Sequence, residues 1–313
     1  MGWVVKLNYQ HLRYFWVVAR NQSLTRGARE LHLTPQTVSG QLKLLEQALG
    51  TNLFRRAGRG LAITEAGEVA FRFAEEIFGL GRELVETLQG EAIDRPLRIR
   101  VGIVDVLPKL VAQRLLVPAT RLQQPVRLVC AEAPAEQLLA DLALHKLDVV
   151  LSDVPIPPWV KIRAYNHPLG ESGVVFLGAP PLAEKYRGSF PGALEHAPVL
   201  LPMEGTALRS SLEQWFKNTG VRPRVVGEFE DSALMKSFGQ EGAGLFPVPA
   251  VIEIEVAAQY RVERVGWADG VIERFFAISV ERRVRHPGVA AICEAAREEL
   301  FAEDRPQGAS DES

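Results

Sequence analysis

The sequence has few of the residues on which several classes of protein depend. Only two cysteines, Cys130 and Cys293, occur among its 313 residues, which excludes a disulfide framework and a cysteine-based zinc site. No uncharged stretch approaches the roughly 18 residues that a membrane span needs. The first residues show neither a secretion signal nor a myristoylation pattern. We therefore expect a cytoplasmic protein with no membrane partner and no cofactor.

Signatures of catalysis are also missing. The six histidines are scattered without an i, i+4 pair, and neither GxSxG nor a phosphate-binding glycine spacing occurs. An enzyme would need an activated nucleophile or a metal cluster. The sequence therefore predicts a protein that is not an enzyme and has no metal site.

Proline and charge both divide the chain near one place. Pro35 is the only proline before residue 90, and the other nineteen start at Pro96. Residues 1–63 hold nine Lys/Arg and two acids, a net charge of +7, whereas the remainder carries −9. The overall charge of −2 thus hides a basic amino-terminal segment, as expected of a protein that binds nucleic acid.

The amino-terminal segment is predicted to be helical. Residues 8–20 have one apolar face, Ser23 is a good N-cap for a second helix, and Thr34 with Pro35 starts a third that runs to about Leu49. Two short helices joined by a tight turn are typical of a helix-turn-helix. Residues 53–63 alternate as a short hairpin, which would form a wing along phosphates.

The third helix exposes polar side chains at its amino end. Gln can pair bidentately with adenine, and the Thr methyl can touch the thymine methyl. We expect Gln36, Thr37 and Gln41 to read base edges. The residues expected to contact phosphates or to complete this surface are Ser23, Thr34, Ser39, Lys43, Arg55, Arg56 and Arg59. Gly40, on the exposed face, suggests a close backbone approach.

A family resemblance follows from these motifs. Residues 23–28 (SLTRGA), 34–39 (TPQTVS), 53–56 (LFRR) and 64–67 (TEAG) resemble the winged helix-turn-helix of LysR-type transcriptional regulators. Together with residues 9–16 and 231–240, they resemble the subgroup that regulates sodium/proton antiporters. The resemblance implies a transcriptional activator that binds double-stranded promoter DNA and contacts RNA polymerase.

A long helix is predicted to follow the hairpin. An apolar stripe runs along residues 64–88 at alternating three and four spacing, while Phe71 and Phe78 occupy another face. In the resembled family this linker helix makes the dimer, and whether dimers pair into tetramers stays open. The residues expected at the dimer contact are Val69, Phe73, Ile77, Leu80 and Leu84.

Strands and helices alternate from residue 97 onward, and the strand–helix–strand–helix–strand order of residues 97–151 predicts a parallel, doubly wound sheet. The expected fold is multidomain, α plus α/β. It comprises a winged helix-turn-helix domain (1–63), a linker helix and hinge (64–95), a two-lobed effector domain like periplasmic binding proteins (96–303) and a disordered tail (304–313). Lobe I would hold residues 96–165 and 269–303, and lobe II residues 166–268. The crossings are expected near 165–168 and 265–269.

Small effectors should bind at the carboxyl ends of the strands, between the lobes. The candidate residues are Asp105, Val106, Asp153, Glu204, Gly205, Thr206, Phe246 and Pro247. The subgroup resemblance suggests the sodium ion as effector, and Asp105, Asp153 and Glu204 could supply three carboxylates if their loops converge. Several of these side chains could equally be helix caps or turn residues.

Other functions stay open beside this one. A regulator of a metabolic operon would respond to a small organic acid instead of sodium. A solute-binding protein would explain the second part of the chain but not its basic beginning. A peroxide sensor would need Cys130 and Cys293 to meet, and their predicted places on a strand and on the last helix favour burial instead.

Overall fold

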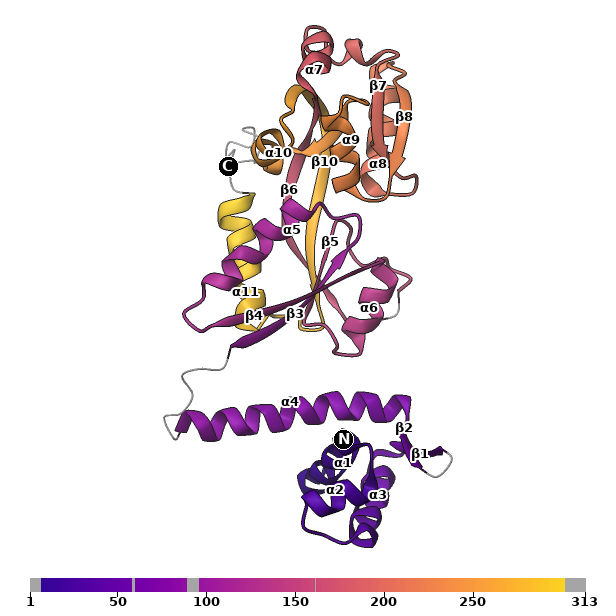
Figure 1. The fold of residues 1–313 in the computed structure, drawn as a ribbon, viewed down its shortest axis with the longest axis vertical. Helices are drawn as coiled ribbons and strands as arrows, with labels where there is room; N and C mark the ends of the chain where they lie inside the picture. Colours follow the sequence, from indigo (N-terminus) through magenta and orange to yellow (C-terminus); the bar gives the residue numbers. More distant parts are fainter. Residues whose placement is uncertain (1–6, 58–59, 89–95, 161, 302–313) are drawn as a thin grey trace, which may run out of the picture. The chain divides into compact units, whose positions relative to one another are not determined.

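The computed structural model of the chain describes residues 7–57, 60–88, 96–160 and 162–301. Contacts divide the chain into two compact units, Met1–Arg95 and Pro96–Ser313 (Figure 1). Arg59, the expected hinge at 89–95 and the expected tail lie outside the described residues. No helix in the described part has the length and apolarity to cross a lipid bilayer.

The first unit consists of three short helices, a hairpin and a long helix. The elements are α1 (Tyr9–Asn21), α2 (Leu24–Glu30), α3 (Pro35–Leu49), β1 (Phe54–Ala57), β2 (Gly60–Ile63) and α4 (Glu65–Leu88). Side-chain oxygens of Asn8, Ser23 and Thr34 cap the first three helices by accepting backbone N–H bonds. The predicted helix-turn-helix, wing and linker helix are therefore confirmed.

Apolar side chains from all four helices form the core of this unit. Phe15 and Val38 are fully buried, and Trp16 packs on Phe78 of α4 with ring centroids 5.2 Å apart. Phe78 thus ties the long helix to its own domain, as its place off the apolar stripe predicted. Leu49, the last residue of α3, is 38% exposed.

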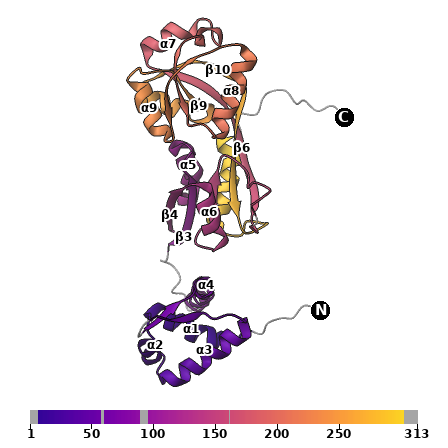
Figure 2. The same cartoon turned by 90° about the vertical axis from the view of Figure 1, so that its right-hand side faces the viewer.

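The second unit contains a six-stranded sheet and a two-stranded sheet (Figures 1 and 2). The strands of the larger sheet, in spatial order, are β4 (Val126–Ala133), β3 (Leu97–Val104), β5 (Val149–Ser152), β10 (Glu263–Ser279), β6 (Tyr165–Gly178) and β9 (Phe246–Pro249). The smaller sheet pairs β7 (Pro198–Pro202) with β8 (Arg224–Phe229) in parallel. The α-helices are α5 (Lys109–Leu116), α6 (Ala135–Ala143), α7 (Pro180–Arg187), α8 (Ala207–Thr219), α9 (Ser232–Gln240), α10 (Glu253–Tyr260) and α11 (Pro287–Ala295). Short 3₁₀ helices occur at Val117–Arg121, Gly192–Leu194 and Ala250–Ile252, and a π-helical segment at Ala296–Leu300.

Two long antiparallel strands, β6 and β10, run through both lobes. Residues 276–278 of β10 pair with β5 in lobe I, whereas residues 263–267 pair with the part of β6 that adjoins β9 in lobe II. The crossings expected at 165–168 and 265–269 both lie inside these strands. One apolar cluster surrounds β3 and β5 and extends to Phe246 and Val256 in lobe II, and a second lies around Phe176 and Trp215.

The larger sheet is mixed, and the parallel arrangement predicted for its strands between residues 97 and 151 is confirmed. Strands β4, β3 and β5 are parallel to one another, but β10 is antiparallel to both β5 and β6. The physical reason is the double crossing. One connecting strand runs from lobe I to lobe II and the other returns, so neighbours at the centre must point in opposite directions.

Candidate nucleic-acid interface and effector cleft

The amino end of α3 presents a polar face. Gln36, Thr37 and Lys43 are exposed, and Ser39 and Gln41 are half-buried. The stripe of Val38, Leu42 and Leu45 beneath them is buried and holds the helix against α1. The residues expected to read bases therefore lie on the outward side of a firmly packed helix.

Gly40 lies in the open middle of this face. A Cβ added there would meet no heavy atom of the chain within 4 Å. Packing inside the domain therefore gives no reason for a residue that costs about 1 kcal/mol relative to alanine in a helix. A surface that must approach closely from outside would give such a reason.

Two of the expected DNA contacts are helix caps. Thr34 Oγ1 accepts a hydrogen bond from the Thr37 N–H (3.2 Å) and lies 2.9 Å from Thr37 Oγ1. Ser23 Oγ accepts from the Arg26 N–H at 3.3 Å. These contacts set the start of α2 and α3, and both side chains still reach the surface.

The wing is fastened directly to α3. Glu46 Oε1 accepts the N–H groups of Leu53 (2.8 Å) and Phe54 (3.1 Å) at the start of β1. Arg55 is exposed on β1, and Arg56 pairs with Leu61 in the hairpin register. Glu46 was not among the predicted site residues. Its place at the end of α3, just before the hairpin, is the signal that could have identified it.

The apolar stripe of α4 is largely open to solvent within the described part of the unit. Leu80 and Leu84 are 65% and 60% exposed. Phe73 is also exposed, whereas Val69 is half-buried and Ile77 packs partly on the domain core. The residues expected at the dimer contact thus form a row along α4. Ile77 belongs to this row and also packs on the core of its own domain.

The candidate effector cleft lies where the carboxyl ends of several strands meet. It contains two neighbouring cavities of about 170 Å³ and about 40 Å³, which share Asp153, Leu208 and Glu273. The smaller cavity is lined from lobe I by Val106, Pro108 and Asp153, and from lobe II by Pro202, Thr206, Leu208, Phe229, Glu230, Ser232 and Met235, with Glu273 from β10. Elements of both lobes therefore build the cleft.

Only some of the predicted cleft residues come together. Val106, Asp153 and Thr206 line the cavities, and Asp105 Oδ1 accepts the Val106 N–H at 2.9 Å beside them. Glu204 and Gly205 instead lie exposed in the turn after β7, where a Glu204 oxygen is 3.9 Å from Arg209. The three expected carboxylates do not converge. Within the described residues, no group of three or more His, Cys, Asp or Glu side chains could hold a metal ion.

The placement of Phe246 and Pro247 in the cleft is wrong. Both are buried in β9, which pairs with β6 as the edge of the larger sheet. The Phe246 ring packs over Gly239 of α9, where an added Cβ would meet it at 2.1 Å. The cause for Phe246 is that α9 covers its side of the strand, and neither residue lines the cleft cavities.

Sequence reasoning missed two charged residues in the cleft region, Glu273 and Lys236. Glu273 Oε2 is buried and has no hydrogen-bond partner, and Lys236 of α9 is only 3% exposed. Lys236 Nζ donates to Ser232 Oγ at 3.1 Å. The spacing of Ser232, Lys236 and Gly239 on one face of α9 was the available signal, because that face is the buried one.

Burial controls the ionisation of these groups. It raises the pKa of Glu273 to about 8, assisted by the Asp153 carboxylate and opposed by Lys236. Burial lowers the pKa of Lys236 to about 8, with Asp231 and Glu273 acting in the opposite direction. The pKa of Asp153 is also raised, first by burial and then by the charge of Asp105. The cleft therefore changes charge near neutral pH.

These shifts predict a pH-dependent stability. The folded-state pKa of Glu273 lies above its ordinary value of 4.5, so the bound proton stabilises the fold at low pH and this contribution is lost as pH rises toward 8. Glu273→Gln removes the titration. From about pH 5 to about pH 8, we expect the unfolding free energy of the native chain to fall relative to the variant by on the order of 2 kcal/mol.

Urea unfolding of both proteins across this range measures the difference. In the native chain the lowered pKa of Lys236 acts on stability mainly between about 8 and its ordinary 10.5, above the range compared. Glu184→Gln, an exposed carboxylate on α7, is the control and should follow the native profile. Parallel profiles for native chain and Glu273→Gln would contradict the prediction.

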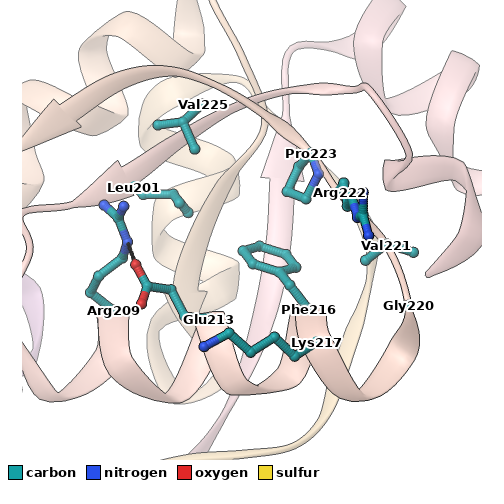
Figure 3. A pocket seen from close by; sticks show the side chains of 10 residues that line it. All are labelled: Leu201, Arg209, Glu213, Phe216, Lys217, Gly220, Val221, Arg222, Pro223 and Val225. Atoms are coloured by element: carbon teal, nitrogen blue, oxygen red, sulfur yellow. Dashed lines mark hydrogen bonds and ion pairs between the residues drawn. The ribbon is translucent and has the colours of Figure 1, made fainter.

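A larger cavity than the two cleft cavities lies elsewhere, between α8 and β8 of lobe II. It measures about 430 Å³ and shares no lining residue with the cleft cavities (Figure 3). Arg209 and Glu213 face each other across its side at 2.7 Å, and Arg209 also bonds Glu228 and the Pro202 carbonyl. Since the Arg209 guanidinium already has these partners, this cavity offers a ligand little unsatisfied charge.

These features define a class of protein, a winged helix-turn-helix DNA-binding regulator with a two-lobed effector domain. Comparison with known families agrees. Residues 9–68 match the bacterial regulatory helix-turn-helix proteins of the lysR family, and residues 95–301 match the LysR substrate binding domain. The chain belongs to the LysR family of transcriptional regulators, which are not enzymes.

Individual relatives support the same assignment. The transcriptional activator protein NhaR of Escherichia coli is 36% identical over 95% of this chain and 97% of its own length. The RuBisCO operon transcriptional regulator of Allochromatium vinosum is 29% identical over 80% and 82% of the two chains. Crystal structures of the LysR family regulator CbnR, alone and with its target DNA, share the fold with TM-scores of 0.52 and 0.51. The free CbnR chain is 20% identical, and its match covers 93% of this chain and 100% of that chain. The DNA-bound CbnR chain is 19% identical, and its match covers 93% of this chain and 98% of that chain.

Proposed function

We propose that this regulator activates transcription by reading promoter DNA with α3, pairing through α4 and sensing a small effector between its lobes. The observation that carries the proposal is the outward face of α3. Gln36 and Thr37 lie exposed at the amino end of a helix whose opposite side is packed, beside an open backbone at Gly40. This is the geometry that places side chains in a major groove.

Each expected DNA contact takes a role from its place. Gln36, Thr37 and Gln41 read base edges. Ser39, Lys43, Arg55, Arg56 and Arg59 contact phosphates, and Ser23 and Thr34 complete the DNA-binding surface. The stripe of Val69, Phe73, Ile77, Leu80 and Leu84 pairs two copies, so that two α3 helices meet two half-sites.

The target proposed is a sodium/proton antiporter or stress gene, with sodium as effector. The subgroup resemblance and the 36% identity to the activator NhaR support this assignment. RNA polymerase is the expected partner at the promoter. In vitro transcription from an antiporter promoter tests it: sodium should raise transcript yield, and potassium at equal ionic strength should not. Equal responses would contradict a sodium effector and favour the alternative, a metabolic operon with an organic acid.

Base reading by Gln36 is tested by Gln36→Ala. Loss of a bidentate pair with adenine should cost about 1–3 kcal/mol on the preferred operator and little on other sequences, so sequence preference relaxes. Fluorescence anisotropy with the operator and with single-base variants measures this. Gln47→Ala, an exposed glutamine at the far end of the same helix, is the control and should leave preference unchanged.

A phosphate contact should behave differently. Arg55→Ala is expected to weaken binding to all sequences alike and to lower the slope of log affinity against log salt by about one. If Gln36→Ala and Arg55→Ala gave the same non-selective loss, the division between base and phosphate contacts would be wrong.

A further inference from the structure

The side chain of Trp16 joins α1 to α4. Its indole Nε1–H donates to Glu75 Oε1 at 2.5 Å, and its ring packs on Phe78 with centroids 5.2 Å apart. Two guanidinium groups also lie over this ring, with Arg20 Cζ 4.9 Å and Arg82 Cζ 5.5 Å from its centroid. Trp16 is only 8% exposed. One buried indole of α1 therefore contacts three residues of α4, through both its ring and its N–H.

These three residues occupy one side of α4. Glu75, Phe78 and Arg82 follow each other at spacings of three and four, so they fall within roughly 60° of one another around the helix axis. The exposed leucines Leu80 and Leu84 fall roughly 170° away from them. The side of α4 that Trp16 holds therefore lies opposite the side that is proposed to pair with a second copy.

The long helix is attached to its domain at two separated places. Near its start, Gly67 lies directly against the backbone oxygen of Leu53, which leaves no room for a Cβ. The contacts of Trp16 reach to Arg82, about 22 Å further along the helix. Among the described residues, the part of α4 in the apolar core of this unit ends at Phe78. Two separated attachments fix the direction of a rod, whereas one leaves it free to tilt.

The direction of α4 sets how far apart two α3 helices lie in a pair. Leu84 is about 25 Å along α4 from Gly67, so a tilt of about 8° would move it by about 3.5 Å, close to the 3.4 Å rise of one base pair. Apolar contacts have no preferred direction, whereas the hydrogen bond and the cation–π contacts of Trp16 do. Because α1 packs on α3, the indole fixes α4 relative to the helix that reads DNA.

We propose that Trp16, Glu75 and Arg82 are positioning residues that set the distance between the two half-sites this regulator selects. This inference rests on the proposed pairing through α4 and adds the residues that determine specificity for operator spacing. The side chains of α3 read each half-site. The contacts of the indole determine which separation of half-sites two copies can read together.

The test uses the full chain with the double change Glu75→Ala/Arg82→Ala. Both residues are exposed, and their charges cancel, so the general attraction to DNA stays constant. Fluorescence anisotropy measures affinity for a duplex with one half-site and for duplexes with two half-sites whose separation changes by single base pairs. The native chain should favour one separation about tenfold over its neighbours, and the variant no more than about twofold. Affinity for one half-site should be unchanged.

Matched variants separate the direction of α4 from its stability. Glu75→Gln keeps an acceptor for the indole N–H, and Arg82→Lys keeps a cation over the ring, so both should retain the native spacing preference. Glu68→Ala removes an exposed carboxylate two turns before Glu75 and should match the native chain. Arg82→Ala alone, a single change at an exposed side chain, should give an intermediate preference.

The native spacing preference in the double variant would overturn the inference. An equal loss of affinity for one and for two half-sites would overturn it as well, because the contacts of Trp16 would then only stabilise the fold. If the native chain binds two half-sites more tightly than one but prefers no separation, the inference fails and the proposed pairing stands. If the native chain binds both kinds of duplex equally, the proposed pairing itself fails.

Discussion

Replacing Gly67 with alanine is expected to unfold the junction between wing and linker helix. Gly67 lies in the first turn of α4, and an added Cβ would meet the backbone oxygen of Leu53 at 2.1 Å. That oxygen also accepts the Thr64 N–H at 3.0 Å, and Thr64 Oγ1 donates to the Asn52 carbonyl at 2.7 Å. Because backbone atoms cannot give way as a flexible side chain can, we expect a loss of about 2–4 kcal/mol in the stability of this unit.

DNA binding should fall with it, on the order of tenfold or more, since the wing and α3 are joined at Leu53 by Glu46. Gly79→Ala is the matched control in the same helix, because a Cβ there meets nothing within 4 Å. It should stabilise α4 by up to about 1 kcal/mol. Urea unfolding and operator anisotropy of both variants provide the comparison. Equal stability of Gly67→Ala and the native chain would show that the junction can relax.

Charging the exposed stripe of α4 should have the second large effect. Leu80 and Leu84 are exposed leucines one turn apart, and two copies that bury them against each other would gain about 25 cal/mol per Å² of apolar surface. In the double variant Leu80→Glu/Leu84→Glu, four carboxylates would face one another. We expect dissociation of the pair through this helix and a loss of operator affinity on the order of 100-fold, because a single α3 then binds a single half-site.

Sedimentation equilibrium measures the oligomeric state, and anisotropy on one-half-site and two-half-site duplexes measures affinity. The variant should bind both duplexes equally weakly. The control for adding a charge at an exposed apolar position is Ile254→Glu. Ile254 lies on α10 of the other unit, is as large as leucine and is 81% exposed. If the variant kept the native oligomeric state and affinity, α4 would not form the dimer contact.

The DNA-binding half was predicted closely because its signals are local. Caps at Ser23 and Thr34, the proline at the start of α3 and the apolar stripe beneath Gln36 act within one or two helical turns. The ends of each helix could therefore be predicted to within about one residue, using only signals from nearby positions in the sequence. The contact of Glu46 with the wing was missed, although it spans only seven residues, because no propensity reports which polar side chain a turn will use.

The effector half was predicted in outline and misplaced in detail. The ends of β3, β5 and β7 do meet, and so Val106, Asp153 and Thr206 share one cleft. Phe246 was misplaced because strand order, and with it the helix that covers β9, is a property of the whole sheet. Asp153 and Glu273 are 120 positions apart, and only the crossing of β10 between the lobes brings them together.

The sequence by itself determined the family, the basic DNA-binding domain and the alternation of strands and helices, since these depend on composition, spacing and local caps. Only the tertiary structure decided which charges are buried together. The reason is physical: the free energy of an ionisable group depends on the solvent and charges it meets in three dimensions, whatever its distance along the chain. Glu204 was a predicted ligand and is exposed to solvent, whereas the ionisable side chains buried beside the cleft are Lys236 and Glu273, one oxygen of which has no partner.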